Sequence, residues 1–193
     1  MDFVEGLHKS EGQEVIFVVV DRFSKYVHFM AIPHPYTASS VARVFIDNVY
    51  KLQGLPDTIV SDRDAVFLSL FWKELFSRQK VKLCYSTTYH PQSDGQTEVV
   101  NKCLKNYLRC MTGTSPTQWV KWLPLAEWWY NTNYHTTTKS TPYEIIYGYP
   151  PPLHIPYFPK DSPVEVVDDF LCKREQILQA VKRNLQDARH RMV

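Results

Sequence analysis

Val15-Ile16-Phe17-Val18-Val19-Val20 is a run of six apolar residues, five of them β-branched. A short β-branched run without polar alternation is typical of a strand that is buried on both faces. Tyr26 to Ile32 indicates a second strand, and the short turn Phe23-Ser24-Lys25 between the two favours an antiparallel hairpin. The hairpin predicts a β-sheet at the centre of the domain.

The sequence on both sides of the hairpin predicts further strands and helices. Shorter strands are expected at Asp2–Glu5, Thr58–Val60 and Val81–Cys84. Helical periodicity indicates helices over residues 37–52, 70–79, 96–111 and 119–130. Strands interspersed with helices predict an α/β domain, a mixed sheet of about five strands flanked by helices.

The length of 193 residues suffices for one sizeable core and a small extension. We expect the core over residues 1–150, and a proline-rich connector with a C-terminal helix over residues 151–193. The prolyl stretch Pro142 to Pro163 is expected to separate the body from that helix, which starts near Val164. Charge in the tail is uneven, because residues 161–169 hold four acids whereas residues 173–191 hold six bases and two acids.

Overall composition limits the possible partners. The formal net charge is only +2, so a nucleic-acid-binding surface would have to be local. The cysteines have no CxxC pair and no histidine at zinc-ligand spacing, which predicts reduced thiols in an intracellular protein; they are Cys84, Cys103, Cys110 and Cys172. The longest apolar run has six residues, too few for a membrane span, so no membrane partner is predicted.

Three short segments place a carboxylate where a structured element meets a loop or the start of a helix. Asp2 lies in the opening strand, Asp62 follows the Thr58–Val60 strand, and Glu98 follows the polar loop Ser86–Gly95. Phosphoryl transfer requires neutralisation of the reacting phosphate and activation of an oxygen nucleophile. Carboxylates bind the hard cations that do both, so the pattern favours metal-dependent phosphoryl transfer.

These segments resemble the catalytic core of integrases from Gypsy-class long-terminal-repeat retrotransposons, relatives of retroviral integrases. That family has two aspartates and a glutamate, with 35 residues between the second aspartate and the glutamate. Residues 63–97 separate Asp62 from Glu98, and 97 − 62 = 35. The resemblance covers residues 2–148. It includes four sequence motifs in order: Asp-Phe-Val-Glu-Gly at 2–6, Ile-Val-Ser-Asp-Arg-Asp at 59–64, His-Pro-Gln-Ser-Asp-Gly-Gln-Thr-Glu at 90–98, and Tyr130-Asn131-Thr132 through Thr141-Pro142-Tyr143-Glu144.

The resemblance implies a ribonuclease H-like fold in which Asp2, Asp62 and Glu98 are catalytic and bind Mg²⁺ or Mn²⁺, as two ions. It implies DNA integration, in which water trims the ends of the element and the freed 3′-hydroxyl attacks target DNA. The implied partners are double-stranded DNA and further copies of the chain. The implied location is the nucleus, with a cytoplasmic particle stage.

The resemblance also bears on the extent of the chain. The opening Met1-Asp2-Phe3-Val4, without a leader, is expected of a segment from a longer polypeptide, in which upstream residues would complete the first strand. The family normally adds a zinc-binding His/Cys domain upstream and a small β-barrel downstream. Strand transfer by residues 1–193 alone is therefore expected to be poor.

The helix after Glu98 carries a ladder of polar and basic residues. Glu98, Asn101, Lys102, Lys105 and Arg109 lie at offsets 0, 3, 4, 7 and 11, which places them on one helical face. Cations beside a metal-binding carboxylate suit a phosphate backbone. Matching positions of the family contact the DNA ends of the element, so Lys102 and Lys105 are the leading DNA-binding candidates, followed by Asn101, Arg109, Gln92 and Gln96.

Several alternatives remain open. Asp21 ends the strongest strand and rivals Asp2 as the first carboxylate, while Asp64 is close enough to Asp62 to support it. The basic ladder could be an ordinary solvated face, and the aromatic residues of the 119–130 helix favour a core or a subunit interface. Two other functions are possible: a catalytically inactive integrase-derived DNA-binding or assembly module, and a metal-dependent nuclease that cuts without joining.

Overall fold

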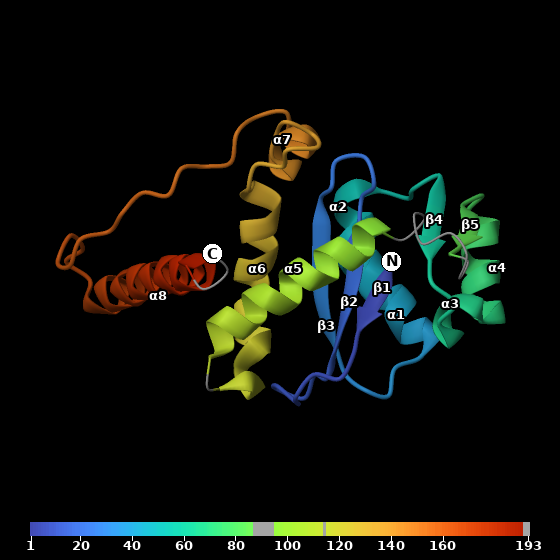
Figure 1. Ribbon diagram of the computed structural model, residues 1–193, viewed down its shortest axis with the longest axis horizontal. Coiled ribbons are helices and arrows are strands. Elements are labelled where there is room, and N and C mark those ends of the chain that lie inside the picture. Colours follow the sequence, from blue (N-terminus) through green and yellow to red (C-terminus); the bar gives the residue numbers. More distant parts are fainter. Residues whose placement is uncertain (87–94, 114, 191–193) are drawn as a thin grey trace.

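The computed structural model describes residues 1–86, 95–113 and 115–190, and within them five strands form a three-stranded and a two-stranded sheet (Figure 1). β1 (Asp2–Val4), β2 (Val15–Val20) and β3 (Val27–Ile32) are antiparallel, with Phe17 opposite both Phe3 and Met30. β4 (Thr58–Ser61) and β5 (Lys82–Tyr85) are parallel. The two groups meet where the Met1 ammonium donates to the carbonyl oxygen of Val60 at 2.7 Å. The predicted hairpin and the mixed α/β fold with about five strands are confirmed, although the strands are hydrogen-bonded as two sheets rather than one.

The predicted 37–52 helix is a continuous helical run in three parts. Thr37 forms a capping box with Ser40 at the start of α1 (Ala38–Phe45). A π-helical segment, η1 (Ile46–Tyr50), and the short α2 (Lys51–Gln53) follow. Gly54 ends the run with a φ of +76°, a conformation that glycine adopts without a steric penalty.

Four other predicted helices are present: α4 (Leu70–Arg78), α5 (Gly95–Thr112), α6 (Trp119–Thr132) and α8 (Glu165–His190). Three short helices were not predicted, namely α3 (Ala65–Leu68), η3 (Pro116–Gln118) and α7 (Pro142–Tyr147). The interpretation of Pro142 to Pro163 as a mere separator was wrong at its start. Pro142 occupies the first turn of α7, where a proline is tolerated, and Thr141 caps the helix together with Glu144.

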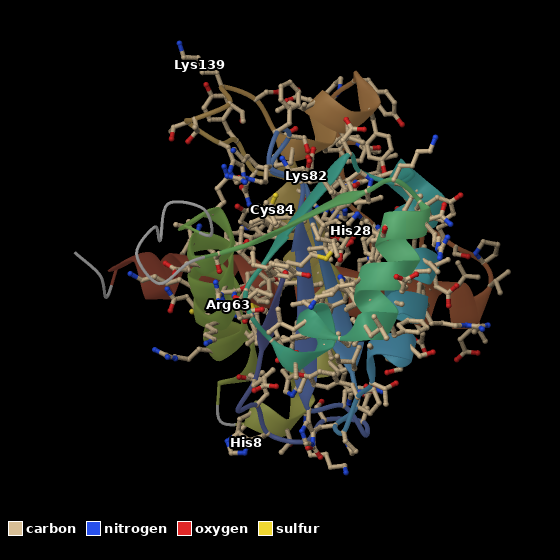
Figure 2. The ribbon with its side chains drawn as sticks, turned by 90° about the vertical axis from the view of Figure 1, so that its right-hand side faces the viewer. His8, His28, Arg63, Lys82, Cys84 and Lys139 are labelled. Carbon is tan, nitrogen blue, oxygen red and sulfur yellow. The ribbon has the colours of Figure 1, made fainter. Side chains whose placement is uncertain are left out.

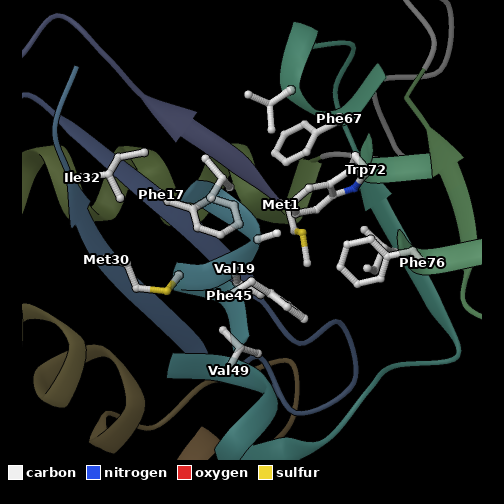
Figure 3. Close-up of a cluster of buried hydrophobic side chains, with 14 of the residues drawn as sticks. Met1, Phe17, Val19, Met30, Ile32, Phe45, Val49, Phe67, Trp72 and Phe76 are labelled. Atoms are coloured by element: carbon white, nitrogen blue, oxygen red, sulfur yellow. The ribbon is translucent and has the colours of Figure 1, made fainter. Parts of the chain in front are cut away.

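The apolar run of β2 separates two hydrophobic clusters. Phe17 packs on one side of the sheet with Phe45, Phe67 and Trp72 from α1, α3 and α4 (Figure 3). Ile16 and Val18 pack on the other side, against residues of α5 and α6. Successive residues of a strand point to opposite faces, so both parities of β2 must be apolar here. The predicted burial on both faces is confirmed.

The connector leaves the body and α8 returns to it. Figure 1 shows the connector extending away from α7 and α8 returning to the body, where it contacts α5. The hydroxyl of Tyr157 donates to Asp168 at 2.7 Å and His154 lies 3.0 Å from Glu175, so the connector is tied to α8. Among the described helices, none combines the length and apolar character needed to cross a bilayer.

Candidate active site and adjoining basic groove

Asp2 opens β1 and is held on both carboxylate oxygens. Its Oδ2 accepts a hydrogen bond of 2.6 Å from Nδ2 of Asn101 on α5. Its Oδ1 accepts one of 2.7 Å from the backbone N–H of Phe3. The half-buried carboxylate therefore fastens the first strand to the helix that carries Glu98 and the basic ladder.

Asp62 follows β4 directly and lies in a tight turn. Its Oδ1 accepts from the backbone N–H of Asp64 at 3.2 Å. The carboxylate of Asp64 caps α3 by accepting from the N–H of Val66 at 2.8 Å. Asp64 thus acts as a helix cap that also steadies Asp62. Figure 2 looks onto this side of the molecule, where the exposed Arg63 marks the turn between β4 and α3.

An aromatic stack links the two aspartate-bearing segments. Phe3, the neighbour of Asp2, lies parallel to Phe67 of α3, with centroids 5.0 Å apart and 4° between the planes. Tyr36 packs on Phe3 at 4.8 Å. Because stacked rings in a packed core resist sliding, this contact fixes the segment of Asp2 relative to the segment that follows Asp62.

Tyr36 is a residue at the site that sequence reasoning missed. Its hydroxyl donates to Oε1 of Glu5 at 2.6 Å. Burial raises the pKa of Tyr36, and the bond to Glu5 and the nearby charge of Asp64 raise it further. A neutral phenol therefore lies beside the carboxylates at physiological pH. No local sequence signal identifies Tyr36, since it approaches the carboxylates only when the chain after β3 folds back.

Glu98 lies in the first turn of α5 and is exposed. Within the described part of the chain, no group of three His, Cys, Asp or Glu side chains is arranged to hold a metal ion. The structure thus brings Asn101 to Asp2, but it does not gather Asp2, Asp62 and Glu98 into one cluster.

The basic ladder of α5 lines a surface groove of about 430 Å³. Six residues form its lining: Glu98, Asn101, Lys102, Lys105, Asn106 and Arg109. The prediction that the ladder shares one face is confirmed, whereas its contact with DNA stays a prediction. Asn106, which the sequence did not single out, also lines this groove.

The remaining candidates for DNA binding are Gln92 and Gln96. Gln92 falls outside the described residues. Gln96 is half-buried and lines a second cavity of about 490 Å³, together with Thr97, Met1 and Val60. Two buried side-chain oxygens, Oε1 of Gln96 and Oδ1 of Asn101, find no hydrogen-bond partner among the residues the structure describes. Oδ1 of Asn101 is an acceptor near Asp2, and Oε1 of Gln96 is an acceptor near the junction of β1 and β4.

Asp21, the rival of Asp2, is engaged in the β2–β3 turn. Its carboxylate accepts from the backbone N–H groups of Phe23 and Ser24 at 3.2 and 3.0 Å, and from the Ser24 hydroxyl. This arrangement gives Asp21 a structural role in closing the hairpin. The geometry favours Asp2, whose assignment as the first catalytic carboxylate stays a prediction.

The aromatic residues of α6 divide between core and surface. Trp119 and Tyr130 are buried in the cluster beneath α5, whereas Trp128 is 46% exposed. The four cysteines are free and half-buried.

Residues 1–91 match the integrase core domain family. The chain is 36% identical over 188 residues to the transposon Tf2-3 and Tf2-4 polyproteins of Schizosaccharomyces pombe, a match that covers 96% of the chain. The chain spans only 14% of the length of these curated relatives.

Solved structures share the fold. The catalytic core domain of HTLV-2 integrase in complex with magnesium, in its trimeric form, aligns with a TM-score of 0.60 at 21% identity, over 76% of this chain and 94% of that one. The catalytic core domain of BIV integrase aligns with a TM-score of 0.57 at 25% identity, over 75% of this chain and 92% of that one. The simian T-cell lymphotropic virus intasome, in complex with a PP2A regulatory subunit, aligns with a TM-score of 0.60 at 22% identity, over 84% of this chain and 58% of that one. The predicted ribonuclease H-like α/β fold is confirmed.

Proposed function

The chain belongs to the integrase core family, and from that premise we propose that it catalyses metal-dependent integration of retrotransposon DNA. The reaction would have two stages, 3′-end processing of the element and strand transfer into target DNA. Asp2, Asp62 and Glu98 are the proposed catalytic residues. The proposal concerns the chain as part of a longer polyprotein, since its relatives are several times longer.

One observation carries the proposal, the 2.6 Å hydrogen bond between Asn101 and Asp2. It joins the first carboxylate to the helical face that holds Glu98 and the basic groove. A phosphate backbone lying along Lys102, Lys105 and Arg109 would therefore enter the space between α5 and β1. Reacting phosphate and carboxylates would meet there, as phosphoryl transfer requires.

Magnesium or manganese, as two ions, fits the donor chemistry of this site. Asp2, Asp62 and Glu98 offer carboxylate oxygens, the ligands that these hard cations prefer. The unpartnered Oδ1 of Asn101 adds a buried acceptor beside Asp2, suited to a metal-bound water. When bound, such ions neutralise the reacting phosphate and activate the attacking oxygen. The similar HTLV-2 core was solved in complex with magnesium, which supports this assignment.

The protein's own residues would orient the reactants. Asn101 and the N–H of Phe3 hold the Asp2 carboxylate, and the Asp64 N–H holds Asp62. The cations of α5 would hold the end of the element by its phosphates. Because the pKa of Tyr36 is raised, its hydroxyl stays neutral and adds no negative charge to a site that already contains carboxylates.

We also propose the partners and the location. Double-stranded DNA, as element ends and target, is the substrate, and further copies of the chain complete the assembly. Related cores solved as a trimer and a dimer, and the intasome of a simian virus, support an assembly of several copies. Integration into chromosomal DNA would take place in the nucleus, after a cytoplasmic particle stage.

A second candidate is a DNA-binding or assembly module without catalysis. The observation that favours it is that the basic groove is formed, whereas the described carboxylates are not gathered for a metal ion. A nuclease that cuts without joining is the third candidate, and the same experiment separates all three.

The test is a strand-transfer assay with the element's own DNA ends, with wild type and Asp62→Asn compared in the same integrase segment of the polyprotein. Joined products that require Mg²⁺ or Mn²⁺ and Asp62 would support integration. Cleavage without joined products would favour the nuclease. DNA binding with neither product, equal in wild type and variant, would favour the assembly module.

A further inference from the structure

Helix α8 presents three different faces. Val181 on the first face packs against the core cluster beneath α5. Asp168 and Glu175 on the second face hold the connector through Tyr157 and His154. The third face adjoins the first, since Ile177 lies one turn before Val181, and towards the start of the helix it carries large apolar side chains in solvent.

This third face has the spacing of a coiled-coil seam. We call it the α8 seam, and its positions follow one another at intervals of 4, 3, 4 and 3: Val166, Phe170, Lys173, Ile177 and Ala180. Val166 is 78% exposed and Phe170 is 71% exposed. At about 100° per residue, the seam lies roughly opposite Asp168 and Glu175, so the connector does not cover it. Exposed apolar side chains gathered in a row indicate a contact surface.

The residues that flank the seam are complementary to themselves. Asp169, Gln176 and Arg183 lie along one border at intervals of seven residues, and all three are exposed. If two α8 helices pack antiparallel along their seams, Gln176 faces Gln176 of the second copy. Asp169 then faces Arg183 of the second copy, and the two-fold axis repeats that ion pair.

The seam itself fits the same register. Phe170 would lie opposite Ala180 of the second copy, a large side chain against a small one. Lys173 would lie opposite Ile177, with its aliphatic stem on the seam and its ammonium group in water. A single polar residue at a seam position fixes register, so Lys173 opposes sliding of one helix along the other.

We propose that α8 is a homotypic docking surface, at which two copies of the chain pair through antiparallel α8 helices. The helix has 26 residues and is therefore about 39 Å long. Figure 1 shows its N-terminal half extending away from α5 and α6. The contact is independent of the DNA groove and of any catalytic activity.

A charge-swap experiment tests the proposal in the intact chain. Asp169→Arg places like charges at both symmetric contacts of its own dimer, and Arg183→Asp does the same with the opposite sign. Each variant alone should dimerise about tenfold more weakly than wild type in sedimentation equilibrium, since paired charges become repelling ones. An equimolar mixture restores opposite charges at both contacts, and its dimerisation constant should return to within about twofold of wild type.

Two further variants complete the design. Gln186→Arg adds a charge to the opposite side of α8 and should leave association unchanged. Phe170→Asp should abolish pairing, and no charge variant should rescue it. All the substituted side chains are exposed, so far-UV circular dichroism should match wild type. A monomeric wild type, single charge variants that associate as wild type does, or a mixture that fails to recover would each overturn the proposal.

Discussion

Asn131 bonds both backbone groups of Val27: its Nδ2 donates to the carbonyl at 2.9 Å and its Oδ1 accepts from the N–H at 2.8 Å. One turn earlier on α6, Glu127 accepts from the N–H of Phe29 at 2.7 Å. β3 is the edge strand on this side of the sheet, and its outward backbone groups would otherwise be buried without partners. Side chains of α6 thus take the place of a neighbouring strand.

Replacing Asn131 with leucine should destabilise the fold by about 2–4 kcal/mol, because two buried backbone groups of Val27 lose their partners. Urea unfolding followed by tryptophan fluorescence measures the change. Asn133→Ala removes a comparable amide from the exposed end of the same helix and should cost about 1 kcal/mol or less. Equal losses of unfolding free energy for the two variants would contradict a particular contribution of the contact between Asn131 and Val27.

Asp62→Asn should weaken Mg²⁺ or Mn²⁺ binding, since the amide keeps the size of the carboxylate but loses its charge. Calorimetric titration of wild type and variant measures the difference, with Asp47→Asn on η1 as a control. We expect at least a tenfold loss of affinity for Asp62→Asn and no change for the control. Identical isotherms for wild type and Asp62→Asn would remove Asp62 from the metal site.

The hairpin and the helices α4, α5 and α6 could be predicted because their signals are local. The β-branched run of β2 and the apolar stripe from Val100 to Met111 each determine one element with little help from elsewhere. α7 was missed because Pro142 was assigned to the proline-rich stretch that separates the body from the last helix, although proline in a first turn is compatible with a helix. The π-helical segment of η1 has no sequence signature of this kind.

The candidate site was only partly predictable, for a similar reason. The resemblance supplied Asp62 and Glu98, and helical geometry supplied the shared face of Lys102 and Lys105. The contact of Asn101 with Asp2 spans 99 positions of sequence, and the approach of Tyr36 to Asp64 also depends on tertiary packing. Such contacts follow from the complete fold and cannot be derived from the periodicity of one segment.

Asn101→Leu should reduce metal affinity about tenfold, since Asp2 would lose the amide that orients it, as with other outer-shell partners of metal ligands. Calorimetry with Mn²⁺ measures this directly, and Asn106→Leu is the matched control on the same groove. The two variants should bind DNA similarly, which separates orientation of Asp2 from contact with phosphate. A loss of affinity shared by both would point to general damage to α5.

Lys105→Glu should weaken DNA binding and make it less dependent on salt. Each phosphate contact that is lost lowers the slope of log K against log salt by about 0.9 on duplex DNA. Fluorescence anisotropy from 50 to 300 mM salt measures the slope. Lys121→Glu makes the same charge change at an exposed position of α6 and should leave the slope unaltered. An unchanged slope for Lys105→Glu would make the ladder an ordinary solvated face.

Tyr107→Phe should leave the protein as stable as wild type at pH 7, or about 1 kcal/mol more stable, because the buried Tyr107 hydroxyl has no partner in the described structure. Burial raises the pKa of Tyr107 to about 12, above the value of 10.0 expected for an exposed tyrosine. The unfolded chain therefore releases this proton first, so the stability of wild type should fall as pH rises from about 10 to about 12. Tyr107→Phe should lose less stability over that range, measured by urea unfolding at each pH. Tyr134→Phe, a change at an exposed tyrosine, should follow the wild-type profile, and a Tyr107→Phe profile equally steep would assign the alkaline loss to other groups.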